Sequence, residues 1–76
     1  MASRAWRFST APYCDFDLVV DTGRGIVLLK EWFDPGKDPM VSRYSLDEFD
    51  ESLIPSHPGR QQLIHDITAF MKSNGR

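Results

Sequence analysis

Two apolar runs that meet at a glycine-containing turn constrain the fold of this chain more than any other feature. The runs cover residues 18–20 and 26–29, and Thr22-Gly23-Arg24-Gly25 lies between them. If Gly23 and Arg24 are the two turn residues of a β-hairpin, the two strands can pair in a single register. In this register Val20 pairs with Val27, Leu18 with Leu29, and Asp17 with Lys30. The pattern predicts a hairpin with one apolar face and a cross-strand charge pair on the other.

Two further strands are expected beside this hairpin. Residues 5–10 alternate in the manner of a half-buried strand, with Trp6, Phe8 and Thr10 on one face. Turn-forming residues fill positions 34–39 and end the second hairpin strand near Phe33. Residues 40–44 can then return as a fourth strand, with Met40, Ser42 and Tyr44 on one face. These segments predict an antiparallel meander.

A short acidic helix is expected after the strands. Ser45 stands three residues before Glu48, the spacing at which a hydroxyl and a carboxylate satisfy free amides at a helix start. Apolar residues recur from there at helical spacing, and Pro55 limits the helix to about two turns. The acidic residues between positions 47 and 51 are interpreted as a solvated face, with an acidic docking motif as the alternative.

The last segment has the strongest helical pattern in the chain. Five apolar residues recur with helical periodicity and form one stripe: Leu63, Ile64, Ile67, Phe70 and Met71. Packing of this stripe on the sheet is the simplest explanation for it. We therefore predict one α+β domain over residues 1–76, a meander of three to four strands with the C-terminal helix packed on one face and the short acidic helix before it.

The small size and high aromatic content of the chain suggest that the domain self-associates. A chain of 76 residues is near the lower limit for an independent core, yet it has two tryptophans, two tyrosines and five phenylalanines. Because so many aromatic side chains exceed what a small core encloses, we expect a homodimer. Residues 1–7 lack the apolar core of a signal peptide, and no segment approaches the length of a membrane span, so a cytoplasmic protein is expected.

Few residues are suited to catalysis or metal binding. The chain has one cysteine, Cys14, and two histidines, His57 and His65. They stand far apart in sequence, without the close pairs that are typical of zinc sites or a recognisable nucleophile motif. The glycines of residues 22–25 precede no helix and no Walker-type lysine, so they fit a hairpin turn better than a phosphate loop. We predict no enzymatic activity, no metal and no cofactor.

The remaining candidates are aromatic and basic side chains of the strand-rich part. One helix covers one side of a sheet, so some strand aromatics should face a partner. Tryptophan, tyrosine and arginine often anchor protein interfaces. The predicted function is that of a non-enzymatic adaptor or inhibitor that binds another macromolecule, chiefly a protein. The candidate binding residues are Trp6, Arg7, Phe8, Arg24, Lys30, Trp32, Lys37, Arg43 and Tyr44.

Two stretches suggest an alternative partner. Residues 29–34, followed by Pro35-Gly36-Lys37, and residues 44–49 together resemble the PC4 family of transcriptional coactivators. The resemblance implies a dimeric subunit of four strands and a helix that binds single-stranded DNA without catalysis. It further implies contact roles for Lys30, Trp32, Lys37 and Arg43. The net charge of −2 disfavours this partner, because affinity for nucleic acid rests largely on neutralised phosphates.

Overall fold

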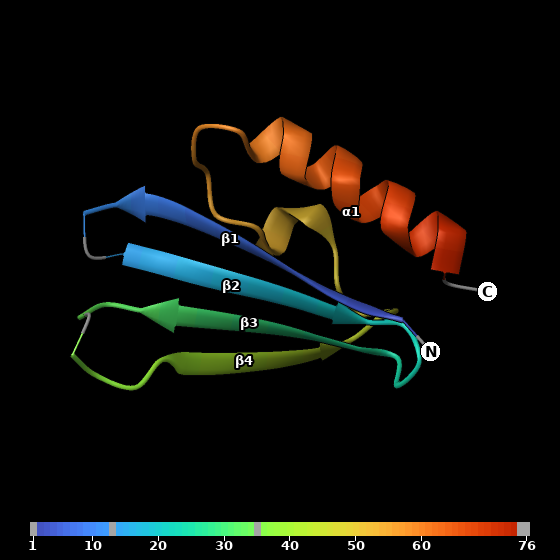
Figure 1. Ribbon diagram of the computed structural model, residues 1–76, viewed down its shortest axis with the longest axis horizontal. Helices are drawn as coiled ribbons and strands as arrows, with labels where there is room; N and C mark the ends of the chain where they lie inside the picture. Colours follow the sequence, from blue (N-terminus) through green and yellow to red (C-terminus); the bar gives the residue numbers. More distant parts are fainter. Residues whose placement is uncertain (1, 13, 35, 75–76) are drawn as a thin grey trace.

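The computed structural model describes residues 2–12, 14–34 and 36–74. In chain order the elements are β1 (Ser3–Ala11), β2 (Cys14–Asp21), β3 (Ile26–Trp32), β4 (Met40–Ser45), the 3-10 helix η1 (Glu51–Leu53) and α1 (Arg60–Asn74). The strands form one antiparallel sheet in the order β1-β2-β3-β4 (Figure 1). The predicted α+β meander with a C-terminal helix is therefore confirmed.

The central hairpin has the predicted register but a different turn. Val20 pairs with Val27, Leu18 with Leu29, and Asp17 with Lys30. The expected two-residue turn is wrong, because the last strand pair is Asp21–Ile26 and residues 22–25 form a four-residue loop. The Gly25 N–H donates to the Asp21 carbonyl at 2.9 Å, and Gly25 has a φ of 72°. A tight two-residue turn would commonly require positive φ at Arg24, whereas the longer loop places glycine in that conformation.

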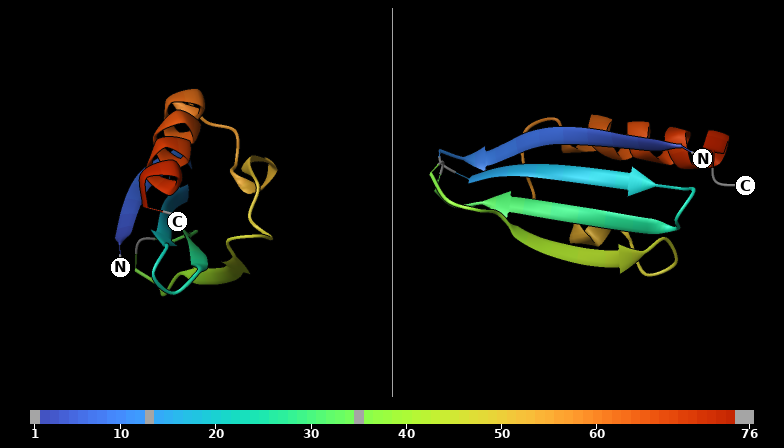
Figure 2. Two further views of the ribbon diagram at one scale, coloured as in Figure 1. Left: turned by 90° about the vertical axis from the view of Figure 1, so that its right-hand side faces the viewer. Right: turned by 60° about the horizontal axis from the view of Figure 1, so that its bottom comes forward.

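One face of the sheet, here called the covered face, packs against α1 and the segment around η1. Figure 2 shows α1 and the segment that contains η1 on the same side of the sheet. The core lies between the sheet and these two segments. It consists of Phe16, Leu18, Val20, Val27, Leu29, Ile54, Leu63 and Ile67. Hydrophobic burial of these side chains is the main force that holds the helix on the sheet.

The capping residues predicted after β4 make the expected bonds, but an α-helix does not follow. The Ser45 N–H donates to Glu48 Oε1 at 3.0 Å, and the Glu48 N–H donates to Ser45 Oγ at 3.2 Å. The short acidic helix expected before α1 is present as η1, but it begins at Glu51 and not at Ser45; the Asp50 carboxylate accepts the Ser52 N–H there at 2.7 Å. A short helix that began at Ser45 would be marginal, and the cap at Asp50 interrupts it.

The stripe predicted for the last helix faces the sheet. Leu63 and Ile67 are buried, whereas Ile64, Phe70 and Met71 are half-buried against the core. Within the described residues, α1 is too short and too polar to cross a bilayer, and no other helix is longer.

Candidate functional site

The other face of the sheet, here called the open face, has neither α1 nor η1 over it (Figure 2). Strand pairing and side-chain alternation assign its members. Its central and most chemically distinctive side chains are Arg7 from β1, Asp15, Asp17 and Val19 from β2, Leu28, Lys30 and Trp32 from β3, and Val41 and Arg43 from β4.

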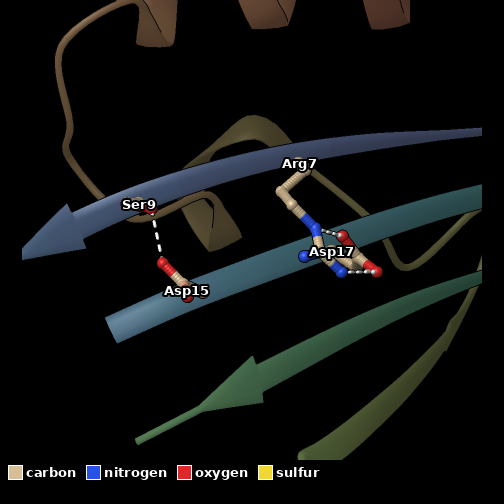
Figure 3. A network of polar contacts seen from close by, with 4 residues as sticks. All are labelled: Arg7, Ser9, Asp15 and Asp17. Atoms are coloured by element: carbon tan, nitrogen blue, oxygen red, sulfur yellow. Dashed lines mark hydrogen bonds and ion pairs between the residues drawn. The ribbon is translucent and has the colours of Figure 1, made fainter. Parts of the chain in front are cut away.

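Arg7, Asp17 and Trp32 form a cluster of mutual contacts on this face. Arg7 Nε lies 2.8 Å from Asp17 Oδ1, and a second bond joins Arg7 Nη2 to Asp17 Oδ2 at 3.1 Å (Figure 3). The Arg7 Cζ atom lies 5.3 Å from the centre of the Trp32 ring, within the range of a cation–π contact. The guanidinium is thereby fixed above an aromatic surface.

The ion pair alters the protonation equilibria of both partners. The hydrogen bond from Arg7 holds the pKa of Asp17 below its ordinary value, against the opposing effect of desolvation. The same bond raises the pKa of Arg7. Asp17 therefore stays ionised near neutral pH. Beside the pair, Ser9 Oγ donates to Asp15 Oδ1 at 2.6 Å (Figure 3).

Charges of both signs alternate with apolar side chains across the open face. Three basic residues, Arg7, Lys30 and Arg43, share it with the three carboxylates of Asp15, Asp17 and Asp21. Between them lie Val19 and Leu28, which are half-buried by their neighbours, and Val41, which is 55% exposed. The face is thus mixed in character and close to neutral.

The predicted aromatic residues are divided between the two faces. Trp32 lies on the open face, whereas Trp6, Phe8 and Tyr44 pack on the covered face against the core. Trp6 meets Phe70 edge to face at 5.7 Å between ring centres. Phe8 stacks between two rings on the covered face, at 5.0 Å from Phe16 and 4.1 Å from His57.

The predicted basic residues are not all brought together either. Arg7, Lys30 and Arg43 lie on the open face. Arg24 belongs to the loop between β2 and β3, where its Nε lies 3.8 Å from Asp21 Oδ2, and Lys37 follows β3 at the opposite end of the sheet. The open face therefore unites four of the nine candidates: Arg7, Lys30, Trp32 and Arg43.

The residues weighed for catalysis stay apart from the open-face cluster. His57 Nδ1 lies 2.8 Å from the Pro55 carbonyl oxygen, and His65 is exposed on α1. Cys14 is half-buried at the start of β2. In the described part of the chain, no three histidine, cysteine or carboxylate side chains are grouped so that they could hold a metal ion.

The candidate binding residues predicted from the sequence do not include the apolar members of the open face. Residues 18–20 and 26–29 are unbroken apolar runs, so they place apolar side chains on both faces of the sheet. Runs of this kind are typical of strands that are buried on both faces. That signal points to Val19 and Leu28 as contact residues.

A scan against protein-family models and searches of the curated proteins and the solved structures found no match for this chain. The similarity to the PC4 family therefore rests on the residues quoted above.

Proposed function

We propose that this chain is a small non-enzymatic interaction protein, an adaptor or inhibitor, that binds another protein through the open face of its sheet. The observation that carries the proposal is that an apolar pair, Val19 of β2 and Leu28 of β3, lies cross-strand at the centre of this face. Val19 and Leu28 occupy the positions opposite the covered face of two central strands, where antiparallel sheets facing water usually place polar residues. A partner would bury these side chains.

The cluster of Arg7, Asp17 and Trp32 supplies an anchor for such a partner. Tryptophan and arginine are enriched among the residues that contribute most to protein-interface affinity. Asp17 and the Trp32 ring hold the Arg7 guanidinium in place, so part of the entropy cost of ordering this long side chain is met before binding.

The charges of the open face favour a protein over a polyanion. Asp15 and Asp17 lie among its basic residues, and carboxylates at these positions would repel phosphates. Equal numbers of acidic and basic side chains suit a partner surface of mixed charge. A second copy of this chain also has such a surface, and a homodimer through the open face forms part of the proposal.

Single-stranded nucleic acid is the second candidate partner. Lys30, Trp32 and Arg43, three of the residues to which the PC4 resemblance gives contact roles, share the open face. An aromatic ring beside basic side chains is the arrangement on which bases stack and phosphates bind.

Affinity capture from the native host, followed by mass spectrometry and measurement of the purified pair, tests the proposal. We expect Trp32→Ala to weaken binding of the captured protein by roughly tenfold or more. The matched control is Phe33→Ala, which removes an aromatic side chain that is 56% exposed and lies just beyond β3. Equal binding by wild type and Trp32→Ala would contradict the proposal. Native mass spectrometry of the full chain tests the homodimer.

A salt titration with a single-stranded oligothymidine separates the two candidates. Phosphate-driven binding must weaken steeply as the salt concentration rises, whereas an aromatic-anchored protein contact changes much less. Tight, salt-sensitive binding of the oligonucleotide that Trp32→Ala abolishes would favour the nucleic-acid candidate. No binding at low salt would remove it.

A further inference from the structure

A groove on the other side of the molecule lies between α1 and the segment around η1. It has a volume of about 130 Å³ and is lined by Phe49, Asp50, Glu51, Ile54, Ile64, Ile67, Thr68 and Met71. Figure 2 shows η1 and α1 on the covered side of the sheet, away from the open face. The groove therefore belongs to a surface that the proposed function does not use.

The floor of the groove is apolar and its size suits one side chain. Five of the lining residues are large apolar ones, and Ile54 and Ile67 also belong to the core. Cavities for drug-sized ligands usually measure roughly 300–1,000 Å³, whereas an apolar cavity of about 150 Å³ holds a single benzene ring. A groove of this volume accommodates one aliphatic or aromatic group.

The rim of the groove is acidic. Asp50 and Glu51 line it, and Asp47 and Glu48 precede them in the chain. Glu48 and Asp50 accept backbone N–H groups, from Ser45 and Ser52. Among the described residues, the ion pairs involve other carboxylates, those of Asp17 and Asp21. The negative charge of the rim is thus available to a basic ligand.

The wall that carries the acidic rim is fastened to α1. Arg60 Nε donates to the Ile54 carbonyl at 3.1 Å, and Arg60 Nη2 donates to the Glu51 carbonyl at 2.7 Å. These bonds tie both ends of η1 to the first residue of the helix. A site whose walls are already in place loses less entropy when a ligand binds.

We propose that this groove binds a segment of a partner protein that inserts one aliphatic or aromatic side chain flanked by lysine or arginine. The apolar floor takes the inserted side chain, and the carboxylates of Asp50 and Glu51 attract the flanking cations. This site is independent of the open face, so the two surfaces allow one copy of the chain to hold two different proteins.

Titration of the isotope-labelled 76-residue chain with three short peptides, followed by amide chemical shifts, tests the proposal. The probe is acetyl-Gly-Arg-Arg-Leu-Arg-Arg-Gly-amide, and one control replaces its leucine by glycine while the other replaces its arginines by glutamates. We expect the probe to shift amides of residues 49–54 and of α1, and each control to bind at least roughly tenfold more weakly, since it lacks either the apolar or the charged contact.

Two pairs of variants locate the binding site. Thr68 and Ala69 are both exposed on α1, but Thr68 lines the groove. Thr68→Phe should block the groove and abolish the shifts, whereas Ala69→Phe should leave them unchanged. Glu51→Gln should weaken binding about threefold, as expected for an exposed charge contact, and Asp47→Asn should have less effect.

Three outcomes would overturn the proposal. Equal binding of the probe and its leucine-free control would indicate charge attraction alone. An absence of shifts in the groove residues, in a wild-type chain that is folded, would exclude the site. Shifts of the groove residues, and not of the open face, that depend on the concentration of the chain without any peptide would assign the groove to a second copy instead.

Discussion

The guanidinium of Arg7 and the carboxylate of Asp17 are joined by two hydrogen bonds across β1 and β2, at 2.8 Å and 3.1 Å. The bond from Arg7 keeps the pKa of Asp17 below its ordinary value of 3.8. A carboxyl whose pKa is lowered by folding makes its full contribution to stability at pH values above its unfolded-state pKa. This contribution is lost as the pH falls through the lower, folded-state pKa.

Asp17→Asn should therefore lower the melting temperature near neutral pH and have a much smaller effect at a pH well below 3.8. The loss should be modest, because the Arg7 side chain is 67% exposed and its ion pair is screened by water and salt. Thermal melts of both proteins over this pH range measure the difference. A gap between them that does not change with pH would contradict the assigned role of the pair.

Leu18→Ala and Leu28→Ala compare the two faces with one chemical change. Leu18 is fully buried on the covered face, and we expect its truncation to lower the free energy of unfolding by about 3 kcal/mol. Leu28 is half-buried on the open face, so the same truncation should cost about 1 kcal/mol. Urea unfolding measures both values. Equal losses in the monomeric chain would contradict the half-exposed position assigned to Leu28 on the open face.

The register of the central hairpin follows from sequence, because a shift of one residue would turn every apolar side chain to the other face. The conformation of its turn does not follow, since Gly23 and Gly25 both tolerate positive φ. Tertiary contacts decide between them. The Leu46 N–H donates to the Gly25 carbonyl at 3.1 Å, which continues the pairing of β3 and β4 into the loop.

The segment after β4 shows how a correct local signal can misplace the start of an element. The bonds between Ser45 and Glu48 form as their spacing predicts. They close a single turn, however, because Leu46 and Phe49 pack against the core at these positions. A capping box fixes where a turn begins, but long-range packing decides how far it continues.

The sequence predicts part of the open face. Alternation alone places Arg7 on the side of β1 opposite Trp6 and Phe8. It does not say which side the helix covers, because the unbroken runs 18–20 and 26–29 place apolar side chains on both sides of the sheet. The contact of Arg7 with Trp32 also depends on strand order, since β2 lies between the strands that carry them.

Gly25→Ala should lower the free energy of unfolding by about 1 kcal/mol, because Gly25 has a φ of 72° that disfavours a residue with a Cβ atom. The space around it is open, so the cost is one of backbone conformation and not of collision. Gly36→Ala is the matched control, since its new Cβ would meet Asp34 Oδ1 at an ordinary contact distance of 3.8 Å. Chemical denaturation measures both variants, and equal costs would contradict the assigned conformation of the loop.

Trp6→Ala and Trp32→Ala should separate folding from binding. Trp6 packs on Phe70 and the core, so its truncation should lower the free energy of unfolding by about 3 kcal/mol. Trp32 contacts Arg7 on the open face, and its loss should cost about 1 kcal/mol or less while it weakens association. Trp6→Phe keeps an aromatic ring and removes an indole N–H that is buried without a hydrogen-bond partner among the described residues, so it should cost less than Trp6→Ala. Denaturation and partner binding are measured on the same preparations. A Trp32→Ala chain that binds normally but unfolds as readily as Trp6→Ala would make Trp32 a structural residue and leave the open face without its anchor.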